Sequence, residues 1–290
     1  MKNVKIAVVF LIAGISMQSC LKDDAFDNGS LQSVASQGGD PKVIELKVAA
    51  ENNTNFVSLA IDNSDDQTTI NFIPVQLATP NNATEDIQVN VVLDPTLVDD
   101  YNTANETEYE ILDASLYEIL NPVVTIPKGS KTGFLQIKIK PSDIIGQSIA
   151  FGFRIESIVQ SGYTISGNFN TAVGSIVTKN QYDGIYESVG YFEHPIYFGD
   201  FVNTWEGVTT ATNTINVPLY VTVNFTSTFF LTVDPATNLV EITSNDLPID
   251  PYVEEDNYYD PATKSYHLDF GYTTSAPRHL TCVATYTGPR

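Results

Sequence analysis

The stretch from Tyr191 to Trp205 concentrates side chains that could bind a ligand. Six of its fifteen residues are aromatic, and Trp205 is the single tryptophan of the chain. Acidic and amide side chains stand between the aromatic ones. A sugar ring has the matching chemistry, because one face carries C–H bonds and the edge carries hydroxyls. The residues that we predict to bind glycan are Tyr191, Tyr197, Phe198, Asp200, Asn203 and Trp205.

The same aromatic residues have an alternative role as the core of a small β domain. Large aromatic side chains are usually buried, and Trp205 is the largest one here. The exposure of Trp205 therefore decides between the two interpretations for this residue.

Residues 250–260 form a second stretch that is both acidic and aromatic. It could hold calcium or line a sugar site, but its acids lack the spacing of an EF-hand loop. A solvated acidic loop is the favoured interpretation. The three histidines, His194, His267 and His279, lack the spacing of a zinc site, so we predict no metal and no cofactor.

Catalytic motifs give little support for an enzyme. The chain has no Gly-x-Ser-x-Gly elbow and no phosphate-binding loop. Its 35 acids offer many carboxylate pairs, which keeps a glycosidase as an alternative. The β modules described below are too small for a (β/α)₈ barrel, and we predict a protein that is not an enzyme.

The N-terminus has the layout of a secretory signal peptide over residues 1–19. Lys2 and Lys5 precede an apolar run from Ile6 to Ile15. This run is too short to span a bilayer core, which needs about 20 apolar residues. Cys20 follows directly and is the predicted site of lipidation.

The segment Met-Gln-Ser-Cys at 17–20 resembles the lipobox of bacterial lipoproteins, although Met17 stands where that pattern prefers leucine. The resemblance implies cleavage before Cys20 and acylation of its thiol, with palmitate as a typical chain. The following Lys22-Asp23-Asp24 resembles the tag that directs Bacteroidetes lipoproteins to the outer face of the outer membrane. Several acyl chains at one site would give a stable anchor.

Composition narrows the possible partners. The net charge is −21, which disfavours nucleic acid and anionic lipid and suits a neutral ligand or one bound with calcium. The hydrophobic fraction of 42% is that of a globular protein. With Cys20 lipidated, Cys282 is left alone, so no internal disulfide forms and packing must stabilise the fold.

Residues 20–41 are rich in Asp, Ser, Gln and Gly and predict a flexible tether. From 42 to 179 the chain alternates apolar and polar residues, as in the run 134–140, and predicts a sandwich of two antiparallel sheets. One helix is expected with Asp94 as its cap and Pro95 at its first position, and with Leu97, Val98 and Tyr101 on one side.

Three segments of this region, 99–102, 109–117 and 124–130, carry a family resemblance. They resemble the immunoglobulin-like domain of unknown function at the N-terminus of Bacteroidetes surface lipoproteins. Those proteins include surface glycan-binding proteins of polysaccharide-utilisation systems and some family-18 endoglycosidases. The resemblance implies a platform or spacer and brings no catalytic residues with it.

Residues 180–290 predict a second, smaller β domain. Of the 15 tyrosines, 11 follow Asn180, and alternation continues through 266–272 and 280–286. The motif Asp-Pro-Ala-Thr occurs at 234–237 and again at 260–263, each time as an expected tight hairpin. A series of hairpins favours a small antiparallel β-barrel, and the region resembles the lipocalin-like or barrel-like domains that accompany the N-terminal family.

The predicted fold is therefore all-β, an immunoglobulin-like sandwich followed by a small barrel. The predicted protein is a surface-exposed outer-membrane lipoprotein that binds a polysaccharide or oligosaccharide as an accessory of a polysaccharide-utilisation system. The alternative is a structural or adhesive lipoprotein whose partner is a protein, such as an outer-membrane transporter complex. A glycoside hydrolase ranks third.

Overall fold

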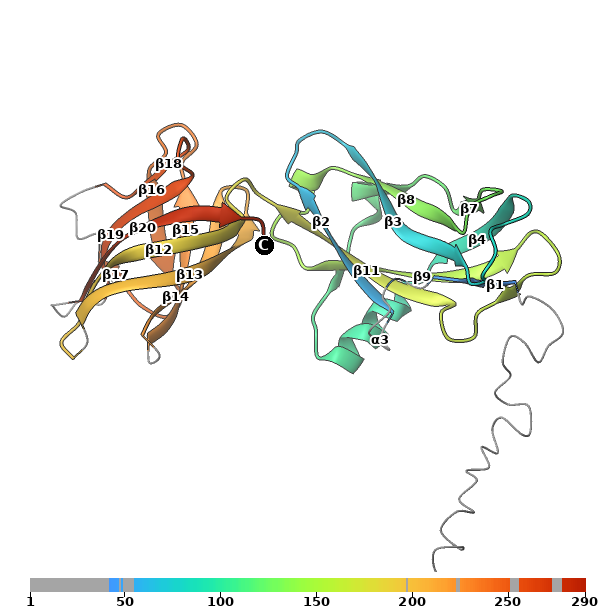
Figure 1. The fold of residues 1–290 in the computed structure, drawn as a ribbon, viewed down its shortest axis with the longest axis horizontal. Helices are drawn as coiled ribbons and strands as arrows, with labels where there is room; N and C mark the ends of the chain where they lie inside the picture. Colours follow the sequence, from blue (N-terminus) through green and yellow to red (C-terminus); the bar gives the residue numbers. More distant parts are fainter. Residues whose placement is uncertain are drawn as a thin grey trace, which may run out of the picture.

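The computed structural model describes residues 42–46, 48, 55–196, 198–222, 225–250, 256–272 and 278–290. The predicted signal peptide, the tether, Cys20 and Tyr197 lie outside the described residues. The described chain is nearly all β and forms a two-sheet sandwich and a nearly closed barrel that lie end to end (Figure 1). The predicted all-β class, a sandwich followed by a barrel, is confirmed, whereas the expectation of two purely antiparallel sandwich sheets is wrong, because each sheet also contains a parallel strand pair.

Two sheets make up the sandwich. The first has the strand order β10-β1-β3-β8-β6, and the second has the order β2-β11-β9-β4-β7, with β5 beside β9. The strands of the first sheet are β1 (Val43–Glu45), β3 (Thr68–Leu77), β6 (Tyr117–Ile119), β8 (Thr132–Ile139) and β10 (Thr164–Ile165). Those of the second are β2 (Phe56–Asp62), β4 (Ile87–Leu93), β5 (Glu110–Ile111), β7 (Val123–Ile126), β9 (Ile149–Ile158) and β11 (Thr171–Lys179).

Alternating side chains fill the space between these sheets. Along β8, Leu135, Ile137 and Ile139 are buried, as their spacing predicts. Phe72 of β3 packs edge-on against Phe151 of β9, with 5.6 Å between ring centroids. Burial of each such side chain stabilises the fold by about 1.5–3 kcal/mol.

The predicted helix is α3 (Thr96–Asn105), which covers one side of the second sheet (Figure 1). Val98 is buried, and Tyr101 stacks on Phe56 with 4.6 Å between ring centroids. The helix begins one residue later than its sequence suggests, because Pro95 is the N-cap and Asp94 accepts a hydrogen bond from the Thr96 hydroxyl. Two short 3₁₀ turns, η2 (Ala114–Leu116) and η3 (Pro141–Asp143), complete the sandwich. No helix in the described part of the chain is long and apolar enough to cross a membrane.

The barrel is one sheet with the order β16-β15-β14-β13-β12-β20-β19-β17, with β18 also paired to β19. Its strands are β12 (Gly184–Glu193), β13 (Phe198–Ala211), β14 (Thr214–Thr222), β15 (Phe225–Val233), β16 (Val240–Ser244), β17 (Ile249–Asp250), β18 (Tyr258–Asp260), β19 (Ser265–Tyr272) and β20 (His279–Gly288). The sheet curls until β16 approaches β18, where Leu239 and Tyr258 form a β-bridge.

The two Asp-Pro-Ala-Thr motifs form matching turns, which confirms both predicted hairpins. In each motif the aspartate accepts one bond from the alanine amide at 2.9 Å and another from the threonine hydroxyl. Asn238 and Lys264 close the turns with φ of 61° and 52°. These bonds hold the pKa of Asp234 and of Asp260 below the ordinary aspartate value. The turns meet where the barrel closes, because Tyr259 N–H donates to the Asn238 carbonyl.

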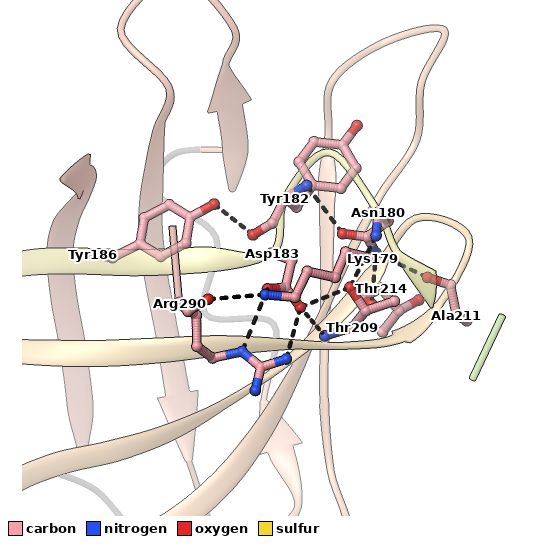
Figure 2. A network of polar contacts seen from close by, with 9 residues as sticks. All are labelled: Lys179, Asn180, Tyr182, Asp183, Tyr186, Thr209, Ala211, Thr214 and Arg290. Carbon is pink, nitrogen blue, oxygen red and sulfur yellow. Dashed lines mark hydrogen bonds and ion pairs between the residues drawn. The ribbon is translucent and has the colours of Figure 1, made fainter. Parts of the chain in front are cut away.

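A buried carboxylate lies at the joint between sandwich and barrel. Asp183 accepts hydrogen bonds from the Thr209 amide and hydroxyl at 3.0 and 2.9 Å, and its side chain is only 2% exposed. Arg290 binds it in a bidentate manner at 3.3 and 3.2 Å (Figure 2). Lys179, the last residue of β11, reaches across from the sandwich to Asp183 at 3.3 Å and to the Arg290 carbonyl at 2.9 Å. One aspartate thus joins both domains to the last strand of the barrel.

Two further residues tighten this joint. The Asn180 side chain donates to the carbonyls of Ala211 and Thr214 and accepts from the Tyr182 amide. Gly146, in the loop after η3, lies so close to β13 that a Cβ would come within 2.1 Å of the Thr210 carbonyl oxygen. The sandwich and barrel therefore meet through close backbone contact as well as through charge.

We expect Asp183→Asn to lower the free energy of unfolding of the barrel by about 2 kcal/mol at pH 7, because Lys179 and Arg290 lose their shared anion. Burial alone would raise the pKa of Asp183, but the bonds from Arg290 and Thr209 outweigh it and hold that pKa below its ordinary value. The stabilisation is complete above the unfolded-state pKa of about 4 and is lost as the pH falls through the lower folded-state value.

Urea unfolding followed by Trp205 fluorescence measures this effect, since the single tryptophan lies in the barrel. The difference in the free energy of unfolding between wild type and Asp183→Asn should become smaller below about pH 4. The exposed Glu206 provides the control, and Glu206→Gln should change stability by less than about 0.5 kcal/mol. Equal stability of wild type and Asp183→Asn at pH 7 would contradict the assignment.

Candidate functional site

The outward face of the barrel carries a row of mostly apolar side chains across five strands. Strand pairing aligns Val202 of β13, Val189 of β12, Val283 of β20, His267 of β19 and Tyr258 of β18. The three valines and Tyr258 are exposed, with Val202 at 66%. Exposed apolar side chains that stand singly need no explanation, whereas a contiguous set marks a surface for binding.

A polar row runs beside the apolar one. It aligns Asp200, Tyr191, Thr281 and Asp269 on β13, β12, β20 and β19. The two rows together place aromatic rings, carboxylates and a hydroxyl on one side of the sheet.

Two shallow grooves lie along these rows and share a floor. One has a volume of about 280 Å³ and the other about 420 Å³. Val189, Gly190 and Thr281 line both, so the grooves are continuous. The first groove adds Asp256, Tyr258, His267, Leu268, Asp269, Cys282 and Val283, and the second adds Tyr191, Asp200, Phe201 and Val202. We refer to the pair as the sheet groove.

Hydrogen bonds hold the polar side chains of the sheet groove in place. Asp269 is bonded through its carboxylate to His279 Nε2, and its backbone N–H and C=O bond to the Asn257 side chain at 2.6 and 3.1 Å. Tyr258 stacks on His267 with 4.4 Å between ring centroids and 4° between planes. His267 Nε2 lies 3.1 Å from the Ser265 hydroxyl. These contacts fix the positions of Asp269, His267 and Tyr258 within the sheet groove.

The predicted site residues divide between the two faces of the sheet. Tyr191 and Asp200 line the sheet groove, and Phe198 is 74% exposed on the same face. Asn203 occupies an inward position, paired with the fully buried Ser188. The structure therefore brings together three of the six predicted residues, and Tyr197 lies outside the described part.

Trp205 belongs to the barrel core, the alternative that the sequence left open for it. Its side chain is 1% exposed and packs in the same buried cluster as Tyr186 and Tyr266. On β13 the odd-numbered residues from Phe201 to Gly207 face inward, while Asp200 and Val202 face outward. Trp205 is thus removed from the groove by the two-residue period of its strand.

Sequence reasoning missed the part of the sheet groove contributed by distant strands. Val189, Asp269, Thr281 and Val283 are not among the site residues that the sequence predicts. Tyr258 and Asp256 belong to the acidic and aromatic stretch at 250–260, for which a sugar site was the less favoured interpretation. Alternation within β19 and β20 places His267, Asp269, Thr281 and Val283 on one face, but only strand order brings that face to Tyr191.

Neither metal nor thiol chemistry is indicated at this site. Among the described residues, no group of three or more His, Cys, Asp or Glu side chains could hold a metal ion. Cys282 faces the core, and burial raises the pKa of its thiol to about 12, so the reactive thiolate does not form near neutral pH.

The fold and the sheet groove define a two-domain β protein with an open groove on the outward face of its second domain. A family model described as an N-terminal domain matches residues 40–162, which covers most of the sandwich. No curated protein matches the chain.

Solved structures from Bacteroides share this architecture. A Bacteroides ovatus protein of unknown function is similar with a TM-score of 0.59 and 11% identity, over 86% of this chain and 96% of that one. A second B. ovatus protein of unknown function has a TM-score of 0.52 and 12% identity, over 85% and 93%. An auxiliary nutrient binding protein from Bacteroides thetaiotaomicron is 12% identical over 82% and 91%, with a TM-score of 0.48. The first two structures, whose TM-scores are above 0.5, show that their fold is similar to this chain over both domains.

The two faces of β13 should respond differently to truncation. We expect Trp205→Ala to lower the free energy of unfolding by about 3–5 kcal/mol, because it leaves a large cavity in the barrel core. Phe198→Ala should change it by less than about 0.5 kcal/mol, since that ring is exposed. Urea unfolding followed by far-ultraviolet circular dichroism compares the two variants with wild type. A large loss of stability in Phe198→Ala, or no loss in Trp205→Ala, would contradict the conclusion that Phe198 faces outward and Trp205 inward.

Proposed function

We propose that the protein is a surface-exposed outer-membrane lipoprotein that binds glycan as an accessory of a polysaccharide-utilisation system. One observation carries the binding role. The sheet groove aligns exposed aromatic and apolar side chains with carboxylates and a hydroxyl on the outward face of β13, β12, β20, β19 and β18. This combination suits a ligand with both apolar faces and hydroxyl edges.

Each kind of side chain has a part in that binding. The rings of Tyr191 and Tyr258 offer apolar surface to the C–H face of a sugar. Asp200 and Asp256 are exposed and accept hydrogen bonds from sugar hydroxyls, while the Thr281 hydroxyl both donates and accepts. The groove is shallow and open along the sheet, which suits a chain that continues beyond the bound sugars.

The proposed role is binding without cleavage. A glycosidase needs one carboxyl that burial keeps protonated as an acid beside a second carboxylate. Asp200 and Asp256 of the sheet groove are exposed, and Asp269 is bonded to His279. These environments favour carboxylates that act as hydrogen-bond acceptors.

The cellular location rests on the N-terminal sequence. The signal-peptide layout, the lipobox-like segment ending at Cys20 and the acidic tag after it support export to the cell surface. Residues 20–41 would then link the lipid to the sandwich. The joint at Asp183 would hold the barrel, and with it the sheet groove, at the far end of the sandwich.

A protein partner is the second candidate function, and one observation favours it. Ile196, Phe198 and Val202 lie at or near the β12–β13 turn and are all more than 65% exposed, at 71%, 74% and 66%. Apolar side chains with such high exposure are typical of protein–protein interfaces as well as of sugar-binding surfaces.

Glycan binding predicts a loss of affinity when the aromatic surface is truncated. We expect Tyr191→Ala and Tyr258→Ala each to weaken binding to a responsive polysaccharide by about 3- to 10-fold, from lost ring contacts of about 0.5–1.5 kcal/mol. Calorimetry of residues 21–290 against plant, fungal and host polysaccharides measures this. Phe134→Ala is the matched control, because Phe134 on the sandwich is 41% exposed and Tyr191 42%.

Three outcomes of the same screen would change the proposal. No affinity for any polysaccharide, together with co-purification of an outer-membrane transporter, would favour the protein partner. Release of reducing sugar would show an enzyme. Equal losses in Phe134→Ala and Tyr191→Ala would place the glycan elsewhere.

Lipid anchoring predicts a dependence on one thiol. We expect Cys20→Ala to abolish incorporation of labelled palmitate and to prevent stable membrane attachment, because the acyl chains supply the anchor at about 0.8 kcal/mol per buried CH₂. Membrane fractionation and protease treatment of intact cells measure attachment and surface exposure. Cys282→Ala is the control, since that thiol lies in the barrel core and should leave labelling unchanged. Labelling of Cys20→Ala would refute the anchor.

A further inference from the structure

Every charged side chain that lines the sheet groove is an acid. Asp200, Asp256 and Asp269 line it, and among the residues that the structure describes no lysine or arginine does. The lining also contains one histidine, His267, whose ring is stacked on Tyr258. The electrostatic potential along the sheet groove is therefore negative.

The basic residues of this domain are engaged elsewhere. Lys264, Arg278 and Arg290 are the only lysines and arginines after Asn180. Lys264 lies over the Tyr286 ring at 5.1 Å, and Arg290 binds the buried Asp183. Burial lowers the pKa of His194 and the nearby charge of Arg278 lowers it further, while Arg278 also opposes the rise that burial causes in the pKa of Tyr272. None of the three lines the sheet groove.

We propose, building on glycan binding at this face, that the sheet groove selects uncharged glycan chains and rejects uronic acid and sulfated ones. A carboxylate can only accept hydrogen bonds, and a neutral sugar hydroxyl can donate one to it in a charge-assisted bond. A uronate or sulfate group would place a further negative charge next to these three aspartates, and the like charges would repel one another. Recognition of such groups ordinarily uses arginine or lysine, and the sheet groove has neither.

The shape of the surface extends this selectivity over several sugars. The aligned rows cross four strand-to-strand steps from β13 to β18, about 19 Å at the usual strand spacing. Tyr191 and Asp200 lie toward one end of this strip, and Tyr258 and Asp256 toward the other. An acid thus accompanies a tyrosine at both ends, so a charged sugar meets repulsion wherever it binds along the strip.

Paired polysaccharides that differ only in charge test the proposal. Suitable pairs are methyl-esterified and de-esterified polygalacturonan, and dextran and dextran sulfate, beside neutral glucans, mannans, xylans and galactans. At low salt we expect measurable affinity for at least one neutral glycan. Any anionic counterpart should bind at least about tenfold more weakly, a gap that narrows in 0.5 M salt because the Debye length falls to about 4 Å.

A double variant separates the groove acids from the charge of the whole protein. The double variant Asp200→Asn/Asp256→Asn should bind the neutral glycan more weakly than wild type. The ratio of its affinities for the neutral glycan and the anionic counterpart should fall toward one. Glu206→Gln with Glu241→Gln removes the same charge from exposed positions outside the sheet groove and should change neither. Equal effects of the two double variants would assign the selectivity to net charge and overturn the role of the groove.

The outcomes distinguish this inference from the function on which it rests. Neutral binding with weak anionic binding supports both. An anionic glycan that binds as tightly as its neutral counterpart overturns the selectivity and leaves glycan binding in place. No binding by any member of either class overturns the proposed function and the selectivity with it.

Discussion

Successive side chains of β12 and β13 point to opposite faces of one sheet, and both the core and the groove depend on this alternation. Tyr186 and Trp205 are paired across the two strands and lie inside the barrel, while Tyr191 and Asp200 are paired in the same way and lie outside. A shift of one residue in register would exchange the two sets. The fully buried rings on one face therefore set the positions of the side chains that line the sheet groove on the other.

The joint around Asp183 extends this order beyond the barrel. A nearly buried carboxylate that binds Arg290 and Lys179 is costly to desolvate, and it is stabilising only while its partners keep their geometry. Lys179 belongs to the sandwich, and Arg290 follows β20, which contributes Thr281 and Val283 to the sheet groove. The same strand thus connects the groove to the joint. Because of this continuity, the barrel has a defined orientation on the sandwich and does not rotate freely about a flexible linker.

Much of the fold followed from local patterns in the sequence. Alternation identified β8 and β19, and the repeated Asp-Pro-Ala-Thr motifs identified two hairpins whose aspartates make the same bonds. The groove followed only in part. Tyr191 and Asp200 were found because they lie in one dense stretch, whereas Asp269 and Thr281 lie at least 69 positions further along the chain and reach the same face only through sheet order. Local composition also misplaced Trp205, since density of aromatic residues carries no information about which face each one takes.

A barrel of this kind could bind a ligand inside or outside, and its interior is already filled. Tyr186, Tyr266 and Trp205 are buried almost completely, with 5.5 Å between the centroids of the two tyrosine rings. Opening that interior to a sugar would sacrifice the packing that stabilises the domain. The outward face has no such cost, but exposed valines and tyrosines make a surface prone to self-association. The net charge of −21 opposes association through repulsion between copies. Negative charge would then have two effects, because repulsion between copies opposes self-association through this apolar face and the three aspartates of the sheet groove would disfavour the approach of anionic ligands.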